Sequence, residues 1–147
     1  MEPRPPRRSL LVALFVAITW AATSFTVAGI LAVLLDRDPV ESPAPVYAGP
    51  AAVALAGFAV WLAVGFTTRA RSPWVGALAA AAAVYLVIVG VALLGSFRLF
   101  AEQVASPFVI ASAVLAALAV AGTWWLVRRP PGAGPPKAGL SGPSPDS

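Results

Sequence analysis

The chain has 147 residues, of which 59% are apolar and only 11% are charged, and its net charge is +4. In soluble domains about a quarter of the residues are charged, so this composition excludes an ordinary soluble domain and indicates an integral membrane protein. There is no Cys and no His, and the one Met is Met1, which excludes disulfides, thiolate catalysis, iron–sulfur clusters and the usual haem, zinc and copper sites. The basic residues form no stripe interleaved with aromatic residues, so we expect no nucleic-acid binding.

Residues 1–9 form a Pro- and Arg-rich tail, and residues 10–35 contain no charge. About 20 apolar helical residues suffice to cross a bilayer, so we expect the first transmembrane helix at 10–35. Arg7 and Arg8 before an apolar run also resemble a twin-arginine or Sec export signal. The run is longer than such signals have, and the best cleavage site, Thr26-Val27-Ala28, lies inside it. An uncleaved span is therefore the expectation, and a cleaved signal the alternative.

The next segment, 36–48, is an acidic loop with three prolines, which favour an extended backbone. Its three acids, Asp36, Asp38 and Glu41, are candidate ligands for Ca²⁺. They lack the glycine turn of calcium-binding loops, so we interpret the segment as a solvated external loop.

A second apolar run covers 49–68, and Pro50 stands in its first turn, where a missing N–H costs little. Residues 69–72 form a short polar turn. Ser72 and Pro73 are typical of the N-cap and first position of a helix, so the third span is predicted at 73–95. The short turn makes these two spans antiparallel neighbours.

Two interpretations remain open for 96–106: a short helix lying in the membrane interface, or a loop anchored by phenylalanines. In the first, Phe97, Phe100, Ala101 and Val104 form an apolar face opposite the polar side chains of Arg98, Glu102 and Gln103. Pro107 opens the fourth span, 107–127, and 128–147 is a low-complexity tail that we expect to be disordered. The predicted fold is an all-α, antiparallel four-helix transmembrane bundle.

Lys and Arg concentrate on the cytoplasmic side of membrane proteins. Eight of the ten basic residues lie in the two tails and the 69–72 turn: Arg4, Arg7, Arg8, Arg69, Arg71, Arg128, Arg129 and Lys137. Only Arg37 and Arg98 lie in the other two loops. This distribution predicts cytoplasmic N- and C-termini. Aromatic belts are expected from Phe66, Trp74, Trp124 and Trp125 at the inner interface, and from Tyr47, Phe97, Phe100 and Phe108 at the outer one.

Helices associate in lipid through close contacts that small residues permit. We expect two buried seams of such residues. In the second span the seam contains Gly49, Val53, Gly57, Trp61 and Gly65, and in the third Gly76, Ala79, Ala80, Ala83 and Gly90. Trp20 and Trp61 are expected to lie deep in the bilayer, with threonine hydroxyls as candidate partners for their indole N–H groups.

The first span carries Thr19, Thr23 and Thr26 on one face, together with Ala22 and Gly29, and we expect this face to look inward. One hypothesis is that these hydroxyls, with Ser24 beside them and with Tyr85 and Ser112, line a small polar site. The alternative is that each hydroxyl bonds a backbone carbonyl of its own helix, or a neighbouring helix.

No Asp, Glu, Lys or His lies inside the spans to act as a base, so we predict no enzyme activity and no catalytic, cofactor-binding or metal site. Small multidrug exporters carry a membrane-embedded Glu, which this chain lacks. The pattern of the four spans resembles that of uncharacterised small four-span membrane proteins of actinobacteria. The resemblance lies notably in two segments, Thr19-Trp20-Ala21-Ala22-Thr23-Ser24-Phe25 and Leu35-Asp36-Arg37-Asp38. That resemblance implies a bacterial plasma membrane and no assigned activity.

Two functions remain open. The first is a non-catalytic scaffold or accessory subunit that packs, within the lipid bilayer, against itself or a larger membrane protein. The second is a pore or carrier for a neutral or weakly polar solute, which would use the Thr19, Thr23 and Thr26 face. A passage needs a cavity that reaches this face, whereas a scaffold needs a packed interior and small residues exposed to lipid.

Overall fold

The computed structural model of the protein describes residues 7–41, 43–67 and 72–128. Regular structure in these residues consists of five helices: α1 (Arg7–Leu35), α2 (Ala48–Thr67), α3 (Pro73–Gly95), α4 (Phe97–Val104) and α5 (Pro107–Arg128). All but α4 are long and apolar enough to span a membrane. The predictions for residues 1–6, for residues 69–71 of the predicted turn and for the tail from residue 129 lie outside the described residues.

Local sequence explains where several helices begin and end. Both α3 and α5 begin at a proline, Pro73 and Pro107, because proline fits the first helical turn. Ser72 precedes α3 with an extended backbone, but its side chain makes no capping hydrogen bond. At the other end of α1, Asp36 has a positive φ of 46°, and Arg37 N donates to Ala32 O over 3.1 Å. Asp tolerates this left-handed region better than most residues, so α1 ends there.

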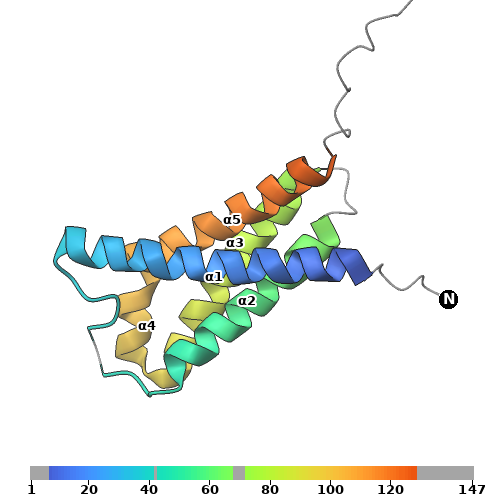
Figure 1. Cartoon of the computed structure of the whole chain (residues 1–147). Coiled ribbons are helices and arrows are strands. Elements are labelled where there is room, and N and C mark those ends of the chain that lie inside the picture. The colour runs from blue at the N-terminus through green and yellow to red at the C-terminus, as the bar shows by residue number, and fades with distance from the viewer. Residues whose placement is uncertain (1–6, 42, 68–71, 129–147) are drawn as a thin grey trace, which may run out of the picture.

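Helix α3 has more neighbouring helices than α1 does. Figure 1 shows α1 lying across the front of the molecule, with α2 diverging from it toward the end where α4 and the 36–47 loop lie. Helix α3 packs against α2, α4 and α5, whereas α1 packs against α2 and α5. The first residues of α1 and the last of α5 lie at the end of the molecule opposite to α4 (Figure 1).

The core consists of small and β-branched side chains. Its centre is fully buried and contains Ala56, Val60, Ala80, Val84, Ala116 and Val120. Ala13, Ala17 and Trp20 of α1 pack onto this cluster. Small side chains at these positions allow the backbones of α2, α3 and α5 to approach closely.

The buried seams differ from the prediction. In α2 the buried positions are Ala48, Ala56, Val60, Val64 and Thr67. Of the predicted glycines, Gly57 faces Trp20 of α1, since a Cβ there would lie 4.0 Å from Cζ3 of Trp20. A Cβ added at Gly49 or Gly65 would meet no atom within 4 Å. The predicted seam is thus one residue away from the observed one, a rotation of about 100° around the helix.

The prediction of the buried residues in α3 is partly correct. Ala80 is fully buried and Gly76 lies against Thr67 of α2, but Ala79 is exposed and a Cβ at Gly90 would meet nothing within 4 Å. The buried residues of α3 are Ala77, Ala80, Val84, Val89 and Ala92. The prediction failed beyond Ala80 because α3 is apolar on all sides, so composition alone does not select the packing face.

The structure has a short helix within 96–106, and the placement of this helix in a membrane interface stays a prediction. This segment contains helix α4, whose first turn is capped by Ser96 Oγ, which accepts a bond from Leu99 N at 3.1 Å. Leu99 and Gln103, on the side opposite to the predicted apolar face, are the buried residues of α4, whereas Phe97, Ala101 and Val104 of that face are exposed.

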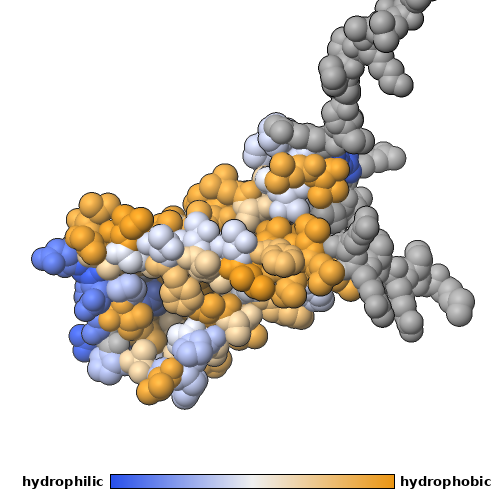
Figure 2. Space-filling model, in the orientation of Figure 1, coloured by the Kyte–Doolittle hydropathy of each residue, from blue (hydrophilic) through white to orange (hydrophobic). Residues whose placement is uncertain are grey.

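The outer surface of the long helices is apolar. Figure 2 shows hydrophobic side chains along α1 and its neighbours, and a concentration of hydrophilic side chains at the end formed by the 36–47 loop and the end of α1. Phe15, Phe25, Val33 and Leu34 of α1 are all more than 60% exposed. Such a surface is stable in hydrocarbon rather than in water.

Candidate functional site

A cavity of about 210 Å³ lies beneath the 36–47 loop. It is bounded by the second half of α1, the first turns of α2 and α5, and the last turns of α3. Helix α4 and the loop close it from above. The residues that line it are Trp20, Ala21, Ser24, Phe25, Ala28, Pro39, Val40, Ala44, Ala48, Gly49, Ala52, Val53, Ala56, Ile88, Val91, Ala92, Leu99, Gln103, Phe108, Val109 and Ser112.

The divergence of α1 from α2 creates the cavity, and one hydrogen bond holds α1 in place beside it. The indole N–H of Trp20 donates to the backbone carbonyl of Ser112 over 3.0 Å. Trp20 is only 4% exposed, and Ala56 beside it is fully buried. Below this level the interior is filled by the valines of the core, so the cavity is confined to the half of the bundle nearest α4.

The roof of the cavity is held by polar contacts between the loop and α4. Gln103 Nε2 donates to Pro39 O at 3.1 Å, and the Glu41 backbone N–H donates to Glu102 Oε1 at 2.7 Å. Neither contact was predicted from the sequence, in which Glu102 and Gln103 were assigned to the polar face of a short helix. The residues that they join are more than 60 positions apart in the chain, so no local pattern carries the signal.

Polar groups are few inside the cavity, and most of them are already bonded. Ser112 Oγ donates to Phe108 O at 3.0 Å, and the Trp20 N–H is occupied as described. Ser24 Oγ is shielded from solvent and, within the described part of the chain, has no hydrogen-bond partner. The cavity is therefore an apolar chamber with one unsatisfied hydroxyl.

The predicted polar face of α1 points the other way. Thr19, Thr23 and Thr26 are exposed, as are Ala22 and Gly29, on the side of α1 opposite to Trp20 and Ser24. Thr23 Oγ1 bonds Thr19 O at 2.8 Å and Thr26 Oγ1 bonds Ala22 O at 3.0 Å. The expectation of an inward face is wrong, and the alternative of bonds within the helix describes two of the three hydroxyls.

Tyr85, which was predicted to line the same polar site as the threonines, lies elsewhere. Its hydroxyl donates to Val104 O at 2.8 Å and so connects α3 to the end of α4. Of the residues proposed for the polar site, only Ser24 and Ser112 line the cavity. Phe108, predicted at the outer belt, is buried and is part of the cavity wall.

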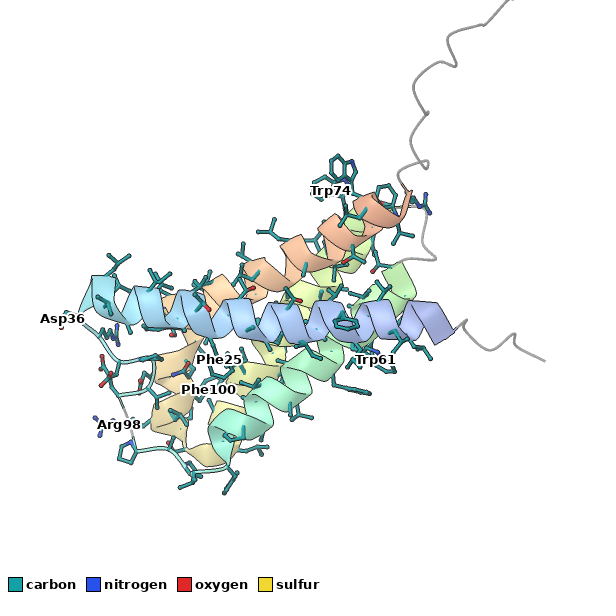
Figure 3. All side chains as sticks on the ribbon, viewed as in Figure 1. Phe25, Asp36, Trp61, Trp74, Arg98 and Phe100 are labelled. Carbon is teal, nitrogen blue, oxygen red and sulfur yellow. The ribbon has the colours of Figure 1, made fainter. Side chains whose placement is uncertain are left out.

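The two tryptophans expected to lie deep have backbone carbonyls as partners, not threonines. Trp61 Nε1 donates to Leu10 O, near the beginning of α1, at 3.4 Å. Figure 3 shows Trp61 toward the end of the molecule where the chain begins, with Trp74 also at that end. Trp124 packs under the guanidinium of Arg128, whose Cζ is 4.6 Å from the ring centroid.

The acidic loop forms one ion pair, between Arg37 and Glu41, which are both about half exposed. Asp36 and Asp38 are exposed. Across 7–41, 43–67 and 72–128, no three His, Cys, Asp or Glu side chains are grouped to hold a metal ion. Nothing in the loop therefore favours the calcium hypothesis over a solvated loop.

Comparisons of the chain with protein-family models, with curated proteins and with solved structures gave no match.

Proposed function

We propose that this protein is a non-catalytic, multi-pass membrane protein that serves as a scaffold or accessory subunit. In this proposal α1, α2, α3 and α5 form an antiparallel four-helix transmembrane bundle. The protein packs through α1 against a second copy or a larger membrane protein. The observation that carries the proposal is the exposed hydroxyl and small-residue face of α1, formed by Thr19, Ala22, Thr23, Thr26 and Gly29 and called the α1 outer face below.

The α1 outer face suits helix association in lipid. Small residues allow two backbones to approach closely, and hydroxyl groups at such contacts add hydrogen bonds of about 0.6 kcal/mol each. Helix α1 has no extensive contact with α3, and it leaves Phe15, Val33 and Leu34 exposed beside this face. The face is thus available for a neighbour in the bilayer.

The interior supports a packed scaffold better than a passage. The core between α2, α3 and α5 is closed by Val60, Val84 and Val120, each at most 1% exposed. The threonines that were expected to line a passage lie outside the bundle. Thr19, Thr23 and Thr26 do not line the cavity beneath the loop, so it gives no support to a pore or carrier built on them, and we do not propose one.

We place the protein in a bacterial plasma membrane with both termini in the cytoplasm. The support is the distribution of charge, with eight of ten basic residues in the two tails and the 69–72 turn. The absence of acids and bases within the spans also favours a role without proton transfer or catalysis.

The test uses the absence of native cysteine, because an introduced cysteine is unique. A cysteine at Thr23 should cross-link in native membranes to a second copy or to another membrane protein. A cysteine at Ala82, which is exposed on α3, serves as the matched control and should give monomer. Replacement of both Ala22 and Gly29 by Leu in the Thr23 cysteine variant should reduce the cross-linked product several-fold. Recovery of monomer alone from the Thr23 variant contradicts the proposal.

A further inference from the structure

The cavity beneath the 36–47 loop has no part in the scaffold role, and its size is sufficient for a small molecule. Its volume is about 210 Å³. An engineered apolar cavity of roughly 150 Å³ stays free of water and binds benzene. The present cavity therefore has room for a molecule somewhat larger than benzene.

The walls select against charged and strongly polar molecules. Apart from Ser24, Gln103 and Ser112, the side chains that line the cavity are Ala, Gly, Val, Leu, Ile, Pro, Phe and Trp. No Asp, Glu, Lys or Arg is among them. A charged ligand would lose its hydration without gaining a partner, which is highly unfavourable.

One opening of the cavity lies between α1 and α2. The roof is fastened by the bonds from Gln103 to Pro39 and from Glu41 to Glu102. Between α1 and α2, by contrast, the lining residues Phe25 and Gly49 are exposed. Figure 3 shows Phe25 in the angle between these two helices. In a membrane this angle faces lipid, so a ligand would arrive from the hydrocarbon phase.

Among the described residues that line the cavity, Ser24 supplies a hydroxyl whose O–H is not donated to any acceptor. The Ser24 hydroxyl is shielded from solvent. Among the described residues, it is a buried side-chain polar group that has no hydrogen-bond partner. Ser112 lines the same cavity, but its hydroxyl already donates to Phe108 O. A buried polar group without a partner is unfavourable, and an oxygen atom on a ligand would remove that penalty.

We propose that this cavity binds an uncharged, mostly hydrocarbon molecule with one hydroxyl group, which enters from the bilayer between α1 and α2 and hydrogen-bonds to Ser24. The inference does not depend on the scaffold role, since the α1 outer face is on the other side of the helix.

The experiment uses the full-length protein in nanodiscs, with a photoactivatable probe: octan-1-ol that carries a diazirine group. Mass spectrometry should locate saturable labelling on cavity residues such as Phe25, Val53 and Ile88. Unlabelled octan-1-ol should compete for this site more effectively than octane. Labelling spread evenly over lipid-facing residues, without saturation, would overturn the proposal.

Two pairs of variants sharpen the test. Ser24→Ala should raise the octan-1-ol concentration needed for half-competition by roughly threefold to tenfold, as expected for one lost hydrogen bond. Ser112→Ala, the matched control, should change it by less than about twofold, because its hydroxyl is already occupied. Equal effects of the two substitutions would rule out hydrogen bonding by Ser24.

The second pair tests occupancy of the cavity itself. Ala52→Phe places a ring in the cavity and should abolish saturable labelling, whereas Ala82→Phe on the exposed side of α3 should leave it intact. Retention of saturable labelling in a folded Ala52→Phe protein would place the probe elsewhere. If Ala52→Phe does not fold, the comparison of Ser24→Ala with Ser112→Ala decides the question.

Discussion

The indole N–H of Trp20 in α1 donates a hydrogen bond of 3.0 Å to the backbone carbonyl of Ser112 in α5. This contact joins residues 92 positions apart and links the first span to the last. Within the described residues α1 packs mainly against α2 and α5, so this bond is a specific restraint on its position.

Trp20→Phe should therefore destabilise the protein by about 1–3 kcal/mol, through the lost hydrogen bond and the smaller ring in a packed site. Trp74→Phe is the matched control, because Trp74 is 72% exposed. Thermal or SDS-induced unfolding in detergent measures both effects. If the two substitutions lower stability equally, the Trp20 bond does not fix α1.

The positions of the four long apolar helices were predictable because the signals are local. Apolar length, Pro73 and Pro107 are read directly from the chain, and α3 has the predicted bounds. Which side of each helix faces its neighbours was not predictable in the same way. The spans are apolar on all sides, so their side chains show little preference for protein over lipid.

Helix α1 illustrates this difficulty. Its threonines were expected to face inward, but Trp20 and Ser24 face the bundle and the threonines face outward. Since a threonine can satisfy its hydroxyl on its own helix, as Thr23 and Thr26 do, it has no need of the interior. For Gln103 the error is the opposite one, since a residue predicted on the polar face of its helix is buried. Its partner, Pro39 O, belongs to a loop that is distant in the sequence and is brought near by the fold.

Gly76 of α3 lies directly against Thr67 of α2, so it should be sensitive to substitution. A Cβ there would clash with the side chain of Thr67, which is only 3% exposed. Thr67 is further restrained by a bond from its Oγ1 to Ala63 O at 2.6 Å. Gly76→Ala should thus cost about 1–3 kcal/mol, the usual range for overpacking.

Gly90→Ala is the control for this prediction, since an added Cβ meets nothing within 4 Å there. It should leave the unfolding transition unchanged or raise it slightly, because Ala favours a helix over Gly by roughly 0.5–1 kcal/mol. A protein that tolerates Ala at both positions would show that α2 and α3 are not in close contact at Gly76.

The loop over the cavity should loosen when its bond to α4 is removed. Glu102→Ala deletes the acceptor of the Glu41 N–H, whereas Glu102→Gln retains a side-chain oxygen at that position. Hydrogen exchange of the Glu41 amide should become about tenfold faster in the first variant and change less in the second.

A second control separates this bond from the charge of the loop. Asp38→Ala removes one negative charge from the same exposed segment and should leave exchange at Glu41 unaltered. Were Asp38→Ala to accelerate exchange as much as Glu102→Ala, loop charge rather than the bond to α4 would control this segment.

The proposed threading is open to a direct test by single-cysteine labelling, because the chain has no cysteine of its own. A cysteine at Ser42 should react with a membrane-impermeant maleimide on intact cells, since we place the 36–48 loop outside. A cysteine at Ser141 should react only after the membrane is permeabilised. The physical basis is the excess of Lys and Arg near the two tails and the 69–72 turn. Labelling of Ser141 but not Ser42 on intact cells would reverse the orientation, and labelling of both would mean that the chain crosses the membrane an even number of times between these two residues.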